Sequence, residues 1–203
     1  MLGKKIIEEK ESKVNGKIIV VRSPVFGTYL QVEGLTQSGG VVSDVWRTTL
    51  WKIKKFKIKN CLILGLGGGS AALLVKRFWS DAKITGVDID PVMVELGKKY
   101  LGLKKVRVVI KDAEDFIKKT KRKFDLILVD TYVGYEYPEK FEKDEFAYSV
   151  KKCLNKGGIA IFNRLYSGEK RAAVLRFGRR LEKIFSKVDF VYPEANLTLL
   201  CYN

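Results

Sequence analysis

The first candidate functional residues in this sequence are glycines that follow a short apolar segment. After Leu64, the glycines Gly65, Gly67 and Gly69 alternate with other residues. Glycines permit a tight turn and let a ligand approach the backbone, and the start of a following helix adds unpaired N–H groups. Ser70 stands where a dinucleotide fingerprint needs glycine, so the pattern is G-x-G-x-G. The run predicts a nucleotide-binding turn, with a ligand-free strand–helix turn as the alternative.

Aspartates end or follow three later apolar segments. Asp88 follows Gly65 at about the spacing (~20 residues) at which an acid binds a ribose diol, so we assign it to a ribose. Asp112 could accept a hydrogen bond from an adenine amino group, and it could also cap a helix, as could Asp90. Asp130 ends a fourth segment, where a carboxylate faces the ligand crevice of an open α/β sheet.

Alternating strands and helices must position these residues. Apolar runs predict strands at 60–64, 83–88, 106–110, 124–130, 158–163, 188–192 and 197–202. Helical stretches fall between them, at 69–78, 92–100, 113–119, 141–154 and 169–185. Repeated strand–helix units with short loops predict an α/β fold, a doubly wound and mostly parallel seven-stranded sheet with an antiparallel strand at one edge.

The N-terminal quarter has a different pattern of predicted elements, with short strands separated by turns. Strands are predicted at 16–22 and 28–32, then a loop flanked by Gly34, Gly39 and Gly40, then a helix over 46–56. We therefore divide the chain into a small β-rich appendage with a lead-in helix, residues 1–55, and a nucleotide-binding α/β domain, residues 56–203.

Composition narrows the class of protein. The 203 residues are 46% hydrophobic, which is typical of a globular chain. The sequence contains no apolar run near the ~20 residues that a membrane helix needs, and no signal peptide is recognisable. Cys61, Cys153 and Cys201 are far apart and lie in apolar segments. We expect a reduced, cytoplasmic chain that does not bind a membrane.

Charge and the absence of histidine restrict the chemistry further. With no histidine, a Ser-His-Asp triad, an imidazole base and a histidine-ligated metal site are excluded, and we expect no metal. The net charge of +16 fits a nucleic-acid partner, and it also fits the lysine-rich surface of a heat-adapted protein. Basic residues gather at 118–123, on a turn expected far from the crevice, and at Arg176, Arg179 and Arg180.

The glycine and aspartate pattern at the four predicted strand ends resembles that of the class I S-adenosylmethionine-dependent methyltransferases. Within that superfamily, the sequence is most similar to the spermidine synthase group. The resemblance rests on residues 61–70, 87–91, 112–113, 124–130 and 156–158, and on the N-terminal stretch 33–37. It implies a transferase whose co-substrate is S-adenosylmethionine or its decarboxylated form. It also implies a small-molecule acceptor such as an amine, which Asp130 would orient or deprotonate. A homodimer stays open.

Departures from the spermidine synthase pattern leave the transferred group open. Gly68 stands where that group has aspartate in G-G-G-D-G, and Val133 replaces the second aspartate of D-S-x-D. The tyrosine–histidine pair of the group's N-terminal region cannot be present in a chain without histidine. Aminopropyl or methyl transfer, methylation of nucleic acid, and non-catalytic adenosyl binding are therefore the three hypotheses.

The loop after Asp130 is the expected substrate loop. It contains Tyr132, Tyr135, Glu136 and Tyr137. The tyrosines could form an aromatic wall for a cationic substrate, or they could simply pack on the end of the sheet. Glu136, and Glu139 just beyond the loop, could replace the missing acids.

Overall fold

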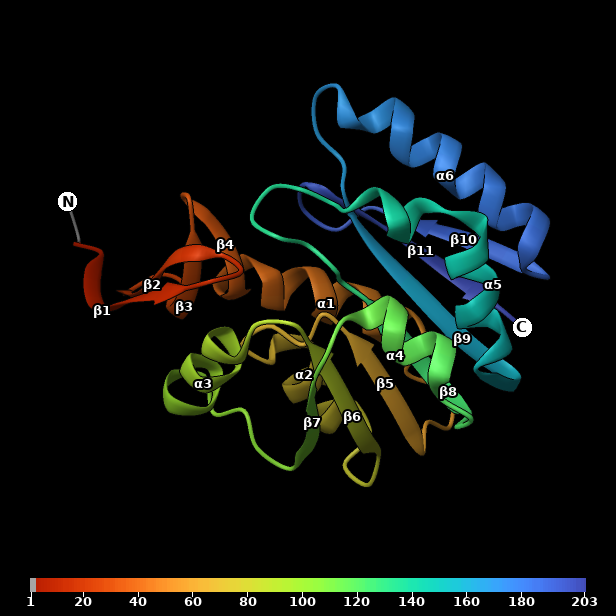
Figure 1. Ribbon diagram of the computed structural model, residues 1–203, viewed down its shortest axis with the longest axis horizontal. Coiled ribbons are helices and arrows are strands. Elements are labelled where there is room, and N and C mark those ends of the chain that lie inside the picture. Colours follow the sequence, from red (N-terminus) through yellow and green to blue (C-terminus); the bar gives the residue numbers. More distant parts are fainter. Residues whose placement is uncertain (1–2) are drawn as a thin grey trace.

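The computed structural model describes residues 3–203; Met1 and Leu2, at the start of the predicted appendage, lie outside the described part. Its larger sheet has seven strands in the order β10-β11-β9-β8-β5-β6-β7 (Figure 1). All pairs from β9 to β7 are parallel, and β11 runs antiparallel to both of its neighbours. The strands are β5 Asn60–Leu64, β6 Lys83–Asp88, β7 Val106–Ile110, β8 Phe124–Val129, β9 Leu154–Leu165, β10 Lys187–Val191 and β11 Asn196–Tyr202. The predicted α/β fold with an antiparallel edge is confirmed.

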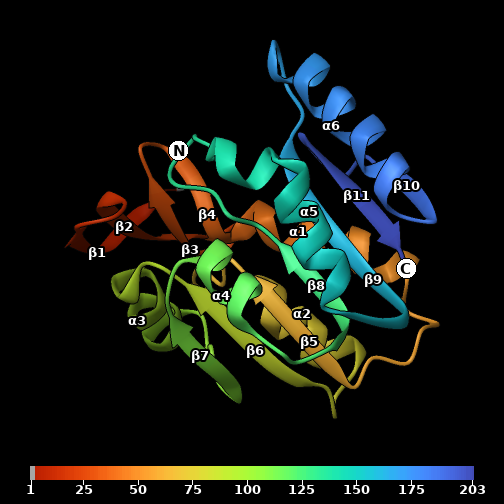
Figure 2. The same cartoon turned by 45° about the vertical axis from the view of Figure 1, so that its right-hand side comes forward.

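Helices cover both faces of this sheet, as Figure 2 shows. One apolar core lies between the sheet and α4–α6, and a second lies between the sheet and α1–α3. Alternate side chains of β5 enter the two cores: Leu62 and Leu64 enter the first, Cys61 and Ile63 the second. The helices are α1 Gly40–Lys52, α2 Ser70–Phe78, α3 Pro91–Tyr100, α4 Ala113–Lys119, the 3₁₀ helix η1 Glu139–Glu142, α5 Asp144–Lys152 and α6 Lys170–Ile184.

An antiparallel sheet of four strands precedes the larger one. It consists of β1 Lys5–Ser12, β2 Gly16–Ser23, β3 Gly27–Val32 and β4 Leu35–Gly39. Its apolar face packs on α3 through a third core that includes Leu30 and Leu96. Asp90 fixes the contact, because Oδ1 caps α3 while Oδ2 accepts hydrogen bonds from Ser12 and Asn15, each 2.6 Å long. The N-terminal strands are thereby held beside the start of α3, at the carboxyl end of β6.

Three predicted elements differ from the structure, and one strand was not predicted. The segment predicted as a loop between Gly34 and Gly40 is strand β4, and α1 begins at Gly40 and ends at Lys52 instead of spanning 46–56. Strand β1 was not predicted, because its five charged residues hide the strand pattern. The single helix predicted over 141–154 is η1 followed by α5. Division of the chain at residue 55 stays a prediction, although α1 packs in the core of the larger sheet. In residues 3–203, no helix combines the length and the apolarity needed to cross a bilayer.

Candidate active site

A cavity of about 470 Å³ opens at the carboxyl ends of the parallel strands. Its floor contains residues that follow β5, β6, β7 and β8, and strand β4 with helix α1 forms the opposite wall. The predicted residues Gly65, Gly67, Asp88, Asp112 and Asp130 all line it. The topology therefore brings together side chains that lie far apart in the sequence, as expected for an open α/β sheet.

The glycine turn is closed by hydrogen bonds within the protein. Gly65, Gly67 and Gly69 have φ angles of 84°, 53° and 93°, in the region where only glycine is unstrained. Gly69 lies behind the cavity, where it is the N-cap of α2. The backbone N–H groups of residues 65–69 all donate hydrogen bonds of 2.6–3.0 Å inside the fold. The acceptors in chain order are Val87 O (twice), Asp88 Oδ2, Ser38 Oγ and Leu66 O.

Asp88 lies between the glycine turn and the cavity. Its Oδ2 accepts from the Gly67 N–H at 2.6 Å, and its Oδ1 accepts from the Asp90 N–H at 2.8 Å. Burial raises the pKa of the Asp88 carboxyl, and these two N–H groups oppose the shift. The carboxylate keeps lone pairs for a diol on the cavity side. Assignment of Asp88 to a ribose stays a prediction.

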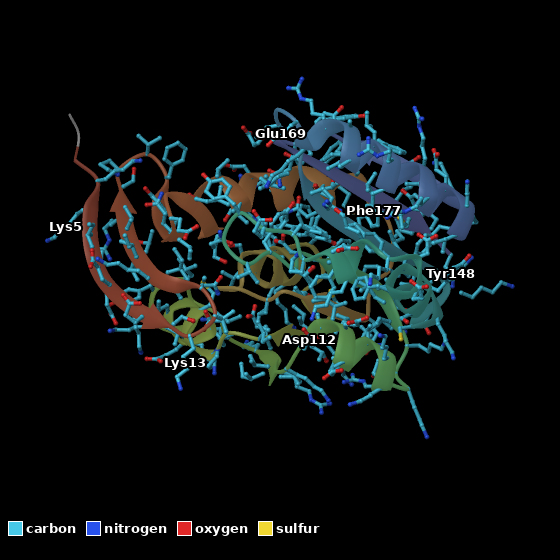
Figure 3. All side chains as sticks on the ribbon, turned by 45° about the horizontal axis from the view of Figure 1, so that its top comes forward. Lys5, Lys13, Asp112, Tyr148, Glu169 and Phe177 are labelled. Atoms are coloured by element: carbon cyan, nitrogen blue, oxygen red, sulfur yellow. The ribbon has the colours of Figure 1, made fainter. Side chains whose placement is uncertain are left out.

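Asp112 is engaged in two ways. Its Oδ1 caps α4 by accepting from the N–H groups of Glu114 and Asp115, and its Oδ2 forms an ion pair with Lys140 of η1. Burial acts to raise the pKa of Asp112, but Lys140 and the helix N–H groups outweigh it and hold the pKa below its ordinary value. Figure 3 labels Asp112 at the start of α4. Its predicted contact with adenine stays untested, and Lys140 lines the cavity beside it.

Asp130 ends a chain of hydrogen bonds that crosses three strands. Trp46 Nε1 donates to its Oδ2 at 3.1 Å, and Asn163 Nδ2 donates to its Oδ1 at 2.9 Å. The Asn163 Oδ1 accepts in turn from Asn196 Nδ2 at 2.9 Å. Burial raises the pKa of Asp130 to about 6, although Asn163 and Trp46 oppose the shift. The carboxylate is thus oriented, ionised at neutral pH, and basic enough to accept a proton from a substrate.

The predicted substrate loop contributes unequally to the cavity. Tyr132 lines it, and its hydroxyl accepts from the Leu165 N–H at 2.6 Å, while burial raises the pKa of this tyrosine to about 12. Tyr137 lies behind the wall, with the Arg164 guanidinium 3.8 Å above its ring centre. Tyr135 and Glu136 are exposed and do not line the cavity. The loop therefore supplies one tyrosine to the site as it stands.

Packing explains one of the two positions that lack the expected acids, Gly68, but not Val133. Val133 forms a short antiparallel bridge with Glu136 and presents an apolar surface to the cavity. Gly68 does not line the cavity. A Cβ atom built on it would lie 2.8 Å from Leu101 and Leu30 side-chain atoms and 2.9 Å from Ser38 Cβ. The N-terminal sheet and α3 fill the space that an acid at this position needs.

We expect Gly68→Asp to destabilise the protein rather than to restore an active-site acid. Overpacking costs about 1–3 kcal/mol, and burial of an unpaired carboxylate adds to it. Chemical denaturation should show this loss. Gly3→Asp makes the same change in open space and serves as the control. A Gly68→Asp variant of unchanged stability would contradict the packing argument.

Several residues of the site were not predicted. Asn163 ends the fifth predicted strand, so its position at a strand end was a signal, although amides were not considered there. Trp46, Glu194 and Asn196 gave no signal. Trp46 lies on a helix of the N-terminal segment, Glu194 lies in the turn between β10 and β11, and Asn196 begins β11.

Comparison with known proteins gives consistent matches. The spermine/spermidine synthase domain family matches residues 48–195. A polyamine aminopropyltransferase of Buchnera aphidicola subsp. Schizaphis graminum is 26% identical over 197 residues, which cover 92% of this chain and 68% of the relative. Spermidine synthase from Thermotoga maritima superposes with a TM-score of 0.72 at 18% identity, covering 98% of this chain and 72% of that one. A spermidine synthase solved with the transition state analogue AdoDATO gives a TM-score of 0.73 at 18% identity, with coverages of 98% and 73%.

Proposed function

The chain belongs to the spermine/spermidine synthase family, and from this premise we propose that it transfers an aminopropyl group from decarboxylated S-adenosylmethionine to an amine. Membership confirms the resemblance inferred from the sequence and the prediction of a transferase. The finer assignment rests on the charges around the cavity, because donors with and without a carboxylate need different partners.

The backbone N–H groups of the glycine turn are already hydrogen-bonded, and this observation favours the decarboxylated donor. S-adenosylmethionine has a carboxylate, which needs a cation or free N–H groups in a partly buried site. Here the N–H groups of residues 65–69 already have acceptors. The lysines that line the cavity, Lys111 and Lys140, lie beside Asp112 on the side assigned to adenine. A donor without the carboxylate leaves no buried anion of the donor unpaired.

The residues around Asp130 support displacement at a carbon bound to sulfur. The attacking amine, once deprotonated, forms a bond to the methylene carbon next to the sulfonium, and the carbon–sulfur bond breaks with its electron pair on sulfur. The products are the aminopropylated amine and methylthioadenosine, and the released proton passes to Asp130. Trp46 and Asn163 fix the carboxylate, and the apolar Val133 and Leu66 help to exclude water.

A paired donor assay tests this function. Each donor is combined with putrescine, cadaverine, agmatine and spermidine, and methylthioadenosine or S-adenosylhomocysteine is measured. We expect methylthioadenosine from the decarboxylated donor and no methyl transfer from S-adenosylmethionine. Calorimetry with both donors, methylthioadenosine and NAD reports binding separately. Methyl transfer, or adenosyl binding with no turnover of any amine, would overturn the proposal.

A further inference from the structure

The edge of the larger sheet opposite the cavity is strongly basic. The amino ends of the parallel strands β5, β6, β7, β8 and β9 meet at this edge, because all five strands run toward the cavity (Figure 1). Five segments lead from the preceding helices into these strands, at 53–59, 79–83, 101–105, 120–123 and 153–156. Together they contain eleven lysine or arginine residues and one acid, Asp81. We call the surface formed by these five segments the basic edge.

The charge of the basic edge is not neutralised within the protein. All eleven lysine and arginine residues are exposed, and none of them is in an ion pair within residues 3–203. Asp125, an acid near the start of β8, is already engaged, because its Oδ2 accepts from the backbone N–H groups of Lys59 and Asn60 at 2.9 Å. The positive charges are therefore available to a partner.

Two general explanations do not account for these charges. Basic residues in the last turn of a helix stabilise its free carbonyl groups, and all five preceding helices have such residues. This effect ends within the last turn, and the eleven bases of the basic edge lie beyond the helices. A heat-adapted surface gains stability from networks of ion pairs, which the basic edge lacks. Unpaired charges of one sign repel each other, and a bound polyanion relieves that repulsion.

An exposed tryptophan borders the basic edge. Trp51 lies in the last turn of α1 and is 54% exposed, and Lys54 Nζ lies 4.0 Å from its ring centre. An exposed aromatic ring among lysines can stack on a nucleobase while the lysines contact phosphates. Four strand spacings from β9 to β7 give the edge a length of about 19 Å. At roughly 3.4 Å per nucleotide of a stacked strand, this length covers about five phosphates.

We propose that the basic edge binds single-stranded RNA, with its lysines on the phosphates and Trp51 stacked on an unpaired base. A single strand fits better than a duplex because only unpaired bases present the ring faces that Trp51 can contact. The basic edge lies across the sheet from Asp130, so bound RNA leaves the cavity open. The inference does not depend on the reaction proposed for the cavity.

Fluorescence anisotropy with a mixed-sequence single-stranded RNA of about 20 nucleotides tests the inference. Wild-type protein should bind at low salt, and the logarithm of its association constant should fall with the logarithm of salt concentration at a slope of about −3.5, the value for about five phosphates. Lys55→Glu/Lys121→Glu changes exposed residues on the segments before the adjacent strands β5 and β8. It should lower the affinity by at least about tenfold and make the slope shallower by about 1.4, because two phosphate contacts are lost.

Trp51→Ala should lower the affinity about tenfold and leave the slope unchanged, because stacking on a base releases no counterions. The affinity for duplex DNA of the same length should not respond to this substitution, since its bases are paired. An unchanged affinity for RNA in Trp51→Ala, or an equal loss with duplex DNA, would overturn the proposed single-strand binding.

Arg176→Glu/Arg179→Glu is the matched control for charge. It changes the net charge by the same amount at two exposed residues of α6, outside the basic edge, and RNA binding should stay close to that of wild type. All variants change exposed side chains, so their melting temperatures should stay close to that of wild type. Equal losses of affinity in the two double variants would assign binding to the total charge of the protein and overturn the inference, as would the absence of RNA binding at low salt.

Discussion

Asp130→Asn is expected to lower kcat for amine transfer by about 10²–10⁴-fold, the usual contribution of a general base. The substitution keeps the size of the side chain and removes its capacity to accept the proton. The affinity for the adenosyl donor should change little, because Asp88 and the glycine turn are untouched. Methylthioadenosine release measures the rate, and calorimetry measures donor binding.

Stability provides the control for this variant. An acid whose pKa is raised by folding is most favourable to the fold at low pH, and this contribution is lost as the pH rises from about 4 to about 6. At pH 7 the neutral asparagine avoids the cost of burying an ionised carboxylate. This gain offsets the lost hydrogen bond where the asparagine amide N–H faces one of the two donors, Trp46 or Asn163. The melting temperature should therefore stay close to that of wild type. An active Asp130→Asn enzyme would exclude Asp130 as the base.

The pH dependence gives a second readout of the same residue. Since the base must be ionised, kcat/KM should fall as the pH drops through about 6, where Asp130 becomes protonated. Asn163→Leu removes a donor that lowers the pKa of Asp130, so the acid limb should move to higher pH. If the acid limb of the kcat/KM profile does not move in Asn163→Leu, it reports the titration of a residue other than Asp130.

The fold could be predicted because its signals are local. Each central strand is an apolar run buried on both faces, and each is followed by a helix with its own start signal, such as Asp90-Pro91. The N-terminal sheet was predicted less well. Strand β1 is mostly exposed, and β4 is polar and follows a tight Glu33-Gly34 turn, so neither shows an apolar pattern.

The site could be predicted only where chemistry coincides with a strand end. Asp88, Asp112 and Asp130 satisfy that condition, and the structure brings them to one cavity. Trp46 and Glu194 reach the same cavity from a preceding helix and from an edge turn, and only tertiary packing decides this. The loss of an acid at Gly68 is likewise a packing effect, since Leu30 and Leu101 come from segments on either side of it.

Gly65→Ala is expected to cause the largest loss of stability among the predicted site residues. A Cβ on Gly65 would lie 2.0 Å from the carbonyl oxygen of Asp130 and 2.5 Å from its carbonyl carbon, and both are backbone atoms that cannot rotate away. The left-handed φ of 84° costs roughly 1–2 kcal/mol for alanine, and the clash adds about 1–3 kcal/mol.

The same clash couples stability to catalysis, because relief requires β5 and the end of β8 to separate and Asp130 to move. A displacement near 1 Å at the reacting groups costs on the order of 10²-fold in rate. Gly102→Ala separates the two effects, since Gly102 has a similar φ of 75° with open space around its Cβ. Denaturation and transfer assays on both variants should show a small stability loss with full activity for Gly102→Ala, and a larger loss of both for Gly65→Ala. Equal stability losses in the two variants would mean that the backbone contact between the glycine turn and Asp130 does not constrain the site.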